Sequence, residues 1–198
     1  MTAALADLRA EYALHAGRSI ALPLAGALVW TIIGITALFL PERTSTMVLL
    51  FGTGTIFPVA LVLARPLRER LLHNPSPLAG LMGRCVFMVN LLWAVHLTVY
   101  AQVPELLPLT LGIGLGLHWV VFGWLIGHPL GVVHASMRTV LVATMWWIMP
   151  EARISAVAAA VVVAYVYSIV ALMSRTVTDS SARPIAPNAG SPFTGTAP

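Results

Sequence analysis

The chain has 198 residues, of which 59% are hydrophobic and 9% are charged, and its mean hydropathy is +0.89. Soluble domains carry about 25% charged residues, so this composition excludes an ordinary water-soluble domain and predicts an integral membrane protein. The pI is near 10.0, but all eleven basic residues are arginines scattered between apolar runs. Because they do not gather on one face, a nucleic-acid-binding surface is not indicated.

The first nineteen residues, 1–19, predict a helix that lies on the membrane surface. Leu5, Leu8, Tyr12 and His15 recur at helical spacing, and the charged residues fall between them. This pattern is typical of an amphipathic helix at the cytoplasmic interface. A secretory signal is not indicated, because the segment lacks a basic start and the apolar run that follows is too long.

Six apolar runs follow, each about 20 residues long, which is the length that a helix needs to cross a hydrocarbon core of about 30 Å. The runs cover residues 20–40, 44–64, 78–100, 106–126, 130–149 and 154–173. The connections are short except for 65–77, so consecutive helices should pack antiparallel. We therefore predict an all-α integral membrane protein whose domain 20–173 holds six transmembrane helices in three hairpins.

A Pro-Glu pair recurs between apolar runs, at 41–42, 104–105 and 150–151. Proline suits the first turn of a helix because it has no N–H to leave unpaired, and a carboxylate there meets the positive end of the helix dipole. The pairs therefore predict three hairpin tips at one end of the bundle, with an external cation ring as the alternative. Nine of the eleven arginines fall on the opposite side, which predicts that both termini are cytoplasmic.

The chain ends in a polar segment, residues 174–198, that is rich in Pro, Ser, Gly and Thr. Such a segment has too little apolar surface to fold, so we expect a disordered cytoplasmic tail. The single cysteine, Cys85, lies in an apolar run and excludes an intrachain disulfide. It has no metal-binding spacing around it and is predicted to be a packing residue.

Polar side chains inside hydrocarbon are costly, so each one is a candidate functional residue. Counting along the helices places Asn90, His118 and Arg138 near the bilayer centre, with His134 one turn from Arg138 on the same face. These four side chains are predicted to line one polar cavity between the third, fourth and fifth helices. No Asp or Glu occurs inside the six runs, so Arg138 is a candidate binding residue for an anion.

Each of these residues also has a structural interpretation. The Arg138 and Arg84 side chains lean toward the N-termini of their helices, so both can extend to the cytoplasmic surface. The histidines, taken singly, are explained by hydrogen-bonded packing, because no metal-binding spacing joins them.

The second run holds Gly52, Gly54 and Pro58 near its middle. Proline removes one helical hydrogen bond, and its ring displaces the carbonyl group of Gly54 four residues earlier. The helix is therefore predicted to bend there, either as a substrate-facing break or as a simple kink. Gly112 and Gly116 in the fourth run have the spacing of close helix packing.

Three stretches occur in an order that resembles a family of small bacterial multi-span proteins, known as a domain of unknown function. They are LRAEYALHAGRSIALPLAGALVW, HNPSPLAGLMGRCVFMVNLLWAVHLTVYAQVPE and LGLHWVVFGWLIGHPLGVVHASMRT. The resemblance covers roughly residues 8 to 140. It implies a protein of the bacterial inner membrane and brings neither an activity nor site residues.

The segment NPSPLAGL is similar to the Asn-Pro-x-Pro-Leu-Gly motif of six-span acetate and succinate permeases. Here Ala79 interrupts the motif, which precedes the third run instead of the first. Helix capping by Asn74, with Pro75 and Pro77 near the helix start, explains the same residues without a substrate.

Two functions remain open on the sequence. The leading hypothesis is a small transporter or permeation protein for a small solute, which is an anion if Arg138 binds it. The alternative is a non-catalytic membrane module that packs with a partner or with a second copy, through the Gly112 to Gly116 face. Neither a catalytic motif nor a cofactor or metal site is indicated. The predicted partners are the lipid bilayer, a small anion and a homo-oligomer, and not nucleic acid.

Overall fold

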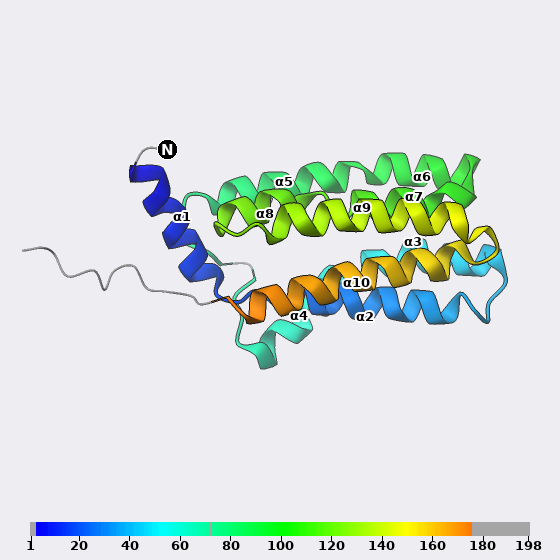
Figure 1. Ribbon diagram of the computed structural model, residues 1–198, viewed down its shortest axis with the longest axis horizontal. Helices are drawn as coiled ribbons and strands as arrows, with labels where there is room; N and C mark the ends of the chain where they lie inside the picture. Colours follow the sequence, from blue (N-terminus) through cyan, green and yellow to red (C-terminus); the bar gives the residue numbers. More distant parts are fainter. Residues whose placement is uncertain (1–2, 72, 176–198) are drawn as a thin grey trace, which may run out of the picture.

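The computed structural model describes residues 3–71 and 73–175, and every regular element in these ranges is a helix (Figure 1). The elements are α1 (Ala3–Ala16), α2 (Ala21–Thr36), α3 (Glu42–Gly54), α4 (Ile56–Leu67), α5 (Ala79–Leu91), α6 (Trp93–Gln102), η1 (Pro104–Leu106), α7 (Leu107–Gly114), α8 (His118–Leu125), α9 (Leu130–Ile148), η2 (Pro150–Ala152) and α10 (Arg153–Met173). The all-α prediction is confirmed. Most of the predicted tail, from residue 176 on, lies outside the described residues.

Several helices are long and apolar enough to span a membrane. Three qualify by themselves: Ala79–Gln102, Pro104–Leu125 and Pro150–Met173. Two pairs qualify only when each bent pair is one span: Ala4–Ala16 with Ala21–Thr36, bent by 58°, and Glu42–Gly54 with Ile56–Leu67, bent by 48°. The described chain therefore has three to five candidate spans, and the prediction of six was wrong.

Two of the predicted runs do not qualify as spans by themselves, for separate physical reasons. The fifth run forms α9, a helix of 19 residues, but His134 and Arg138 lower its hydropathy. The first run forms α2, which has only 16 residues because the chain turns at Ala37. α9 is thus excluded by its composition, and α2 counts as a span only together with α1.

The bend predicted before Pro58 is confirmed. The helix is interrupted at Thr55, between α3 and α4, and the two axes differ by 48°. Thr55 donates its N–H to the carbonyl oxygen of Gly52 over 2.9 Å, which tightens the last turn of α3. Proline cannot donate to the carbonyl group of Gly54, so the ladder is broken at this point.

The three Pro-Glu pairs gather at one end of the bundle. Pro41 precedes α3, and the other two prolines open the short helices η1 and η2. Glu42, Glu105 and Glu151 line one cavity of about 230 Å³ there, together with Arg153. Within the described ranges no three carboxylate, histidine or cysteine side chains can hold a metal ion, so the glutamates do not form a common metal site.

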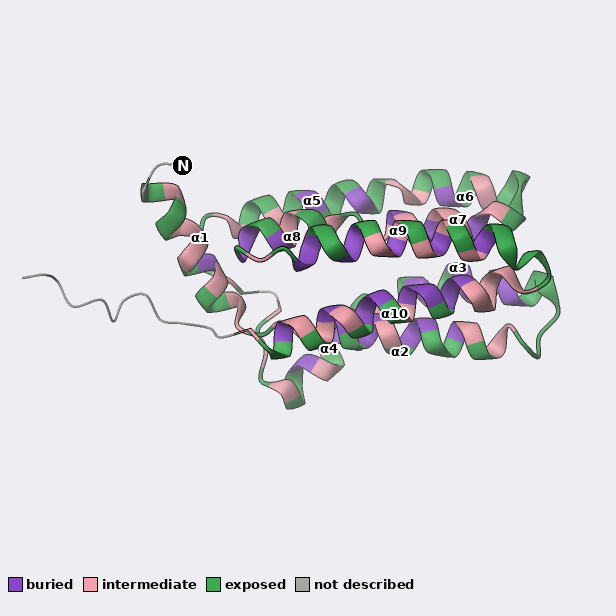
Figure 2. Ribbon diagram, in the orientation of Figure 1, coloured by how far each residue is buried: buried purple, intermediate pink, exposed green. Residues whose placement is uncertain are grey.

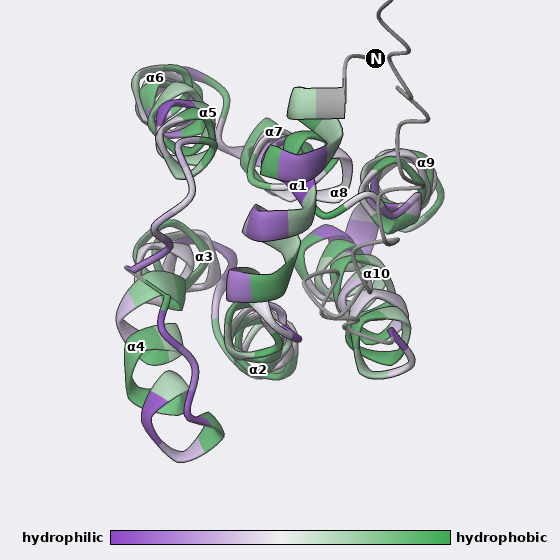
Figure 3. Ribbon diagram, turned by 90° about the vertical axis from the view of Figure 1, so that its left-hand side faces the viewer, coloured by the Kyte–Doolittle hydropathy of each residue, from purple (hydrophilic) through white to green (hydrophobic). Residues whose placement is uncertain are grey.

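At the opposite end, α1 lies across the bundle (Figure 3). Two side chains of the connection before α5 hold it: the Asn74 amide donates to the carbonyl group of Tyr12 over 3.2 Å, and the Ser76 hydroxyl donates to Leu8 over 3.3 Å. Tyr12 is buried in this contact. α1 is therefore docked on the bundle.

The position of this helix at the membrane interface stays a prediction, whereas the expected amphipathic pattern is weak. Apolar and polar residues are not strongly sorted between the two sides of α1, and His15 is exposed. Arg175, just after α10, donates from Nη2 to the carbonyl groups of Ala13 and Gly17 over 2.8 Å each. The helix end is thus fixed by a distant arginine, and partial burial lowers the pKa of that arginine.

A carboxylate from the same connection fixes the start of α2. Glu69 accepts the N–H groups of Ile20 and Ala21 over 2.7 and 3.0 Å. These donors have no partner inside the helix, and the negative charge meets the positive end of the helix dipole. The connection 65–77 therefore joins α2 to α1 at one end of the bundle.

The core lies where α10 packs along α2 and α9 (Figure 2). Its largest fully buried apolar residues include Trp30, Ile33, Leu49, Leu107, Leu111 and Leu130. By contrast, α5 and α6 present mostly exposed residues. The bundle is thus packed around α2, α9 and α10, with α5 and α6 at its side.

Two glycines let α8 and α9 approach closely. A Cβ at Gly131 would overlap the carbonyl oxygen of Trp119 and lie 2.8 Å from the Cα of Gly123. A Cβ at Gly123 would in turn lie 2.6 Å from the backbone nitrogen of Gly131. Backbone atoms cannot move aside as a flexible side chain can, so neither position tolerates a larger residue.

We predict that Gly131→Ala lowers the free energy of unfolding by about 1 to 3 kcal/mol, because it overpacks the contact with α8. The matched control is Gly83→Ala in α5, where a Cβ meets nothing within 4 Å. It should be neutral or stabilising by up to about 1 kcal/mol through helix propensity. Thermal unfolding in detergent measures both, and equal unfolding temperatures would contradict the close packing of α8 on α9.

Candidate functional site

Arg138, in the middle of α9, is a fully buried arginine with an exposed fraction of 0%. Its Nε donates to the carbonyl oxygen of Gly112 in α7. Among the described residues, neither Nη1 nor Nη2 has a hydrogen-bond partner. The side chain therefore does not extend to the surface, whereas the exposed Arg84 folds back so that its Nη1 would lie 3.4 Å from a Cβ at Gly80.

The acceptor for Arg138 is exposed by a break between α7 and α8. α7 ends at Gly114, α8 begins at His118, and the N–H of Gly116 donates to Ile113 over 2.9 Å instead of to Gly112. The carbonyl group of Gly112 thereby lacks its usual helical donor and accepts the guanidinium. Gly116 also makes room, because a Cβ there would lie 2.7 Å from the Cδ of Arg138.

His134 lies one turn from Arg138 on α9 and is also fully buried. Its Nδ1 is 2.7 Å from the Ser168 hydroxyl and 3.1 Å from the carbonyl oxygen of Ala164. A carbonyl only accepts, so the second contact requires the proton on Nδ1 and leaves a lone pair on Nε2. That Nε2 atom has no hydrogen-bond partner in the described chain.

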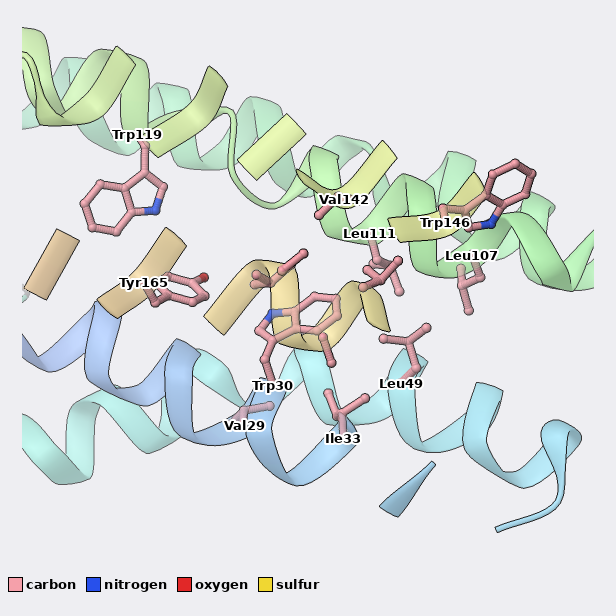
Figure 4. Packing of buried hydrophobic residues seen from close by; sticks show 14 of the residues in the cluster. Val29, Trp30, Ile33, Leu49, Leu107, Leu111, Trp119, Val142, Trp146 and Tyr165 are labelled. Carbon is pink, nitrogen blue, oxygen red and sulfur yellow. The ribbon is translucent and has the colours of Figure 1, made fainter. Parts of the chain in front are cut away.

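Three aromatic rings enclose the two buried side chains. The Arg138 guanidinium carbon lies 5.2 Å from the ring centre of Tyr165 and 5.8 Å from that of Trp30. The His134 ring stacks on Trp119 at 4.3 Å. Figure 4 shows Tyr165 between Trp119 and Trp30, with both indole nitrogens on the side of the tyrosine. Neither indole N–H is hydrogen-bonded within the described ranges.

The structure brings together three of the four predicted site residues. His118, at the start of α8, is half-buried and lies within electrostatic range of Arg138 and His134. We define the buried polar cluster by the residues Trp30, His118, Trp119, His134, Arg138, Tyr165 and Ser168. Its members come from α2, α8, α9 and α10.

Asn90 is not part of the buried polar cluster. It is exposed on α5, and its amide donates to the carbonyl group of Val86 one turn earlier over 2.9 Å. α5 faces the bundle through Cys85 and Val89, which are spaced by four residues, so the next residue along points away. The predicted position of Asn90 was therefore wrong.

The predicted helix break also faces away from the cluster. Gly54 and Pro58 are exposed, and the neighbour of Gly52 is the side chain of Ile33. The buried face of α3 and α4 is formed by other residues, among them Thr53 and Ala60. The interruption that contacts the cluster is the one between α7 and α8.

A family model matches residues 5–175. The chain belongs to DUF7010, a family of unknown function. No curated protein and no solved structure matches it. Membership of DUF7010 confirms the predicted resemblance to a family of unknown function, and it assigns no activity. The function of this DUF7010 chain must therefore be inferred from the buried polar cluster.

The aromatic and hydroxyl members of the cluster were not among the residues predicted from the sequence. Trp30, Trp119 and Tyr165 are ordinary residues of apolar runs by composition, and only contacts between distant helices bring them together. Ser168, a polar residue inside the last apolar run, was the one sequence feature that could have pointed to these members of the cluster. A serine in such a run needs a partner, which here is His134.

We predict that Ser168→Ala lowers the free energy of unfolding by about 1 kcal/mol, because it removes the hydroxyl that contacts buried His134. The control is Ser174→Ala, at the exposed end of the same helix, which should be silent. Thermal unfolding of the two variants in detergent tests the contact. A silent Ser168→Ala would show that this hydroxyl does not support His134.

Proposed function

We propose that the chain is a small transporter or permeation protein and that Arg138 binds its substrate, a small anion. One observation carries this proposal: a fully buried guanidinium has both terminal nitrogens unpartnered among the described residues. Burying an unpaired ion costs several kcal/mol even after relaxation. A single carbonyl acceptor and two aromatic faces offset only part of that cost. A bound anion would supply the missing charge and acceptors.

Transport also requires a second conformation, because Arg138 and His134 are closed off in this one. The element best placed to open the site is the turn 115–117 between α7 and α8, which already lacks regular helical bonding beside Arg138. Movement of this turn would shift the carbonyl group that accepts from the guanidinium. It would at the same time shift α8, which helps to close the cluster.

We place the protein in a bacterial inner membrane, following the family resemblance. The end that carries α1 and most of the arginines faces the cytoplasm in this proposal, because cytoplasmic flanks retain positive charge. The Pro-Glu tips then face outward.

Arg138→Gln tests the proposal, because glutamine removes the charge and keeps a polar side chain. We expect small anions to raise the unfolding temperature of the wild-type protein and to have no such effect on Arg138→Gln. Arg138→Lys should recover part of the effect, since an ammonium lacks the planar fork. The measurement is thermal unfolding of the reconstituted protein with small carboxylates, nitrate and phosphate, followed by flux of the best ligand.

The matched control is Arg84→Gln, which removes an exposed arginine outside the cluster. It should keep the full anion effect. If Arg138→Gln and wild type respond alike to every anion, Arg138 is a structural residue and the transport proposal fails.

A second candidate function is supported by the exposure of α5 and α6. Only 17% of the apolar stretch in Ala79–Gln102 is buried, against 44% in each of the other two unbent spans. The exposed amide of Asn90 lies on this surface. An amide both donates and accepts, so two copies can pair through it inside a membrane. The chain would then be a non-catalytic module that associates with itself through α5.

The face predicted for such packing, Gly112 to Gly116, is already occupied within the chain. A Cβ at Gly112 would lie 2.8 Å from the side chain of Val142, and Gly116 adjoins Arg138. These small residues therefore pack against α9 within the chain, and the second candidate function is assigned to α5 instead.

We predict that Asn90→Cys in a Cys85→Ser background forms a cross-linked dimer in native membranes on mild oxidation, if α5 is the contact. Val163→Cys, on the exposed side of α10, should stay monomeric under the same conditions. Gel mobility with and without reductant gives the result. The absence of a specific cross-link at position 90 would remove this second function.

A further inference from the structure

The buried polar cluster contains an unusual excess of hydrogen-bond donors. Nη1 and Nη2 of Arg138 and Nε1 of Trp30 and of Trp119 are all buried, and none is hydrogen-bonded in the part of the chain that the structure describes. They come from three different helices, α9, α2 and α8. Guanidinium and indole nitrogens only donate, so a ligand that satisfies them must present acceptors. Among the buried atoms of the cluster that lack a hydrogen-bond partner in the described chain, Nε2 of His134 is the one that can accept.

The charge of the cluster limits the charge of that ligand. Arg138 is the only member of the cluster that carries a permanent charge. Trp30, Tyr165 and Ser168, from α2 and α10, are uncharged, and the other titratable nitrogens of the cluster belong to His118 and His134. A monoanion therefore leaves the site neutral. A dianion would leave one uncompensated negative charge among buried aromatic rings, which is costly in a low-dielectric interior.

The shape of the cluster limits the ligand further. A guanidinium is planar and donates in parallel to two oxygens, which suits a carboxylate edge better than a tetrahedral oxyanion. Around it lie the ring faces of Tyr165 and Trp30, at 5.2 and 5.8 Å, and the stacked pair of Trp119 and His134. Such walls favour an apolar body on the ligand.

We propose that the buried polar cluster recognises a singly charged carboxylate with an apolar body, whose oxygens accept from Arg138 and from the indole N–H groups of Trp30 and Trp119. This inference rests on the proposed anion transport and adds the substrate class to it. The aromatic rings then enclose the body of the ligand, and multiply charged anions are rejected by the missing second positive charge.

Ligand ranking on the full-length protein tests the class. Benzoate, acetate, nitrate, phosphate and sulfate are compared at equal ionic strength by the shift in unfolding temperature and by titration of tryptophan fluorescence. Benzoate should bind most tightly, acetate more weakly, and sulfate and phosphate not measurably. Equal or tighter binding of sulfate, phosphate or nitrate overturns the carboxylate class while leaving anion binding intact.

Two variants test the indole donors without removing the rings. Trp30→Phe and Trp119→Phe should each weaken benzoate binding about tenfold, because each removes one hydrogen bond to a charged acceptor. Trp147→Phe is the matched control, since Trp147 is 74% exposed and outside the cluster, and it should bind as wild type does. Unchanged binding by both cluster variants overturns the assigned indole contacts.

The same experiments distinguish a failure of the carboxylate assignment from a failure of the proposed anion transport. If no anion binds and Arg138→Gln has no effect, anion transport itself fails. If a cluster variant does not fold, the wild-type ranking of benzoate against sulfate still decides the substrate class.

Discussion

The burial of the Arg138 guanidinium is the constraint on which the centre of this bundle depends. A charge at 0% exposure needs an acceptor, and the chain supplies one by interrupting α7 and α8 so that the carbonyl group of Gly112 is released from its helix. Gly116 leaves the space that the arginine stem fills. The packing of α9 and the break between α7 and α8 therefore depend on each other. Within the described residues the two terminal nitrogens have no hydrogen-bond partner, and the proposed function assigns them to a ligand.

The two ends of the bundle are built by different chemistry. At the end with the Pro-Glu pairs, helices begin at prolines and carry carboxylates in their first turns. At the other end, contacts between distant parts of the chain hold the structure: Glu69 caps α2, and Arg175 binds the end of α1. In the proposed transporter these ties keep α1 across the cytoplasmic end, so the turn 115–117 is the better candidate for movement.

The candidate site was predictable where it depends on neighbours along one helix. His134 and Arg138 are four residues apart, so their shared face followed from helical geometry alone. The prediction for Asn90 failed because the depth of a residue in a span does not say which side of α5 meets the bundle. Cys85 and Val89 are the residues of α5 that are buried against the bundle. The break before Pro58 formed as predicted from covalent chemistry, yet its direction relative to Arg138 depended on how α3 and α4 pack.

The sequence by itself determined the helical class, the resemblance to a family of unknown function, the bend before Pro58 and the unpaired charge of Arg138. Each of these follows from composition or from residues close together in the chain. The tertiary structure alone decided that three to five helices qualify as spans, that α1 docks on the bundle, and that Trp30, Trp119 and Tyr165 enclose Arg138 and His134. The number of candidate spans depends on where each helix ends or bends. The docking of α1 and the aromatic cluster depend on the rotation of each helix about its own axis. That rotation is set by packing among helices of similar apolar composition, where periodicity gives no preferred face.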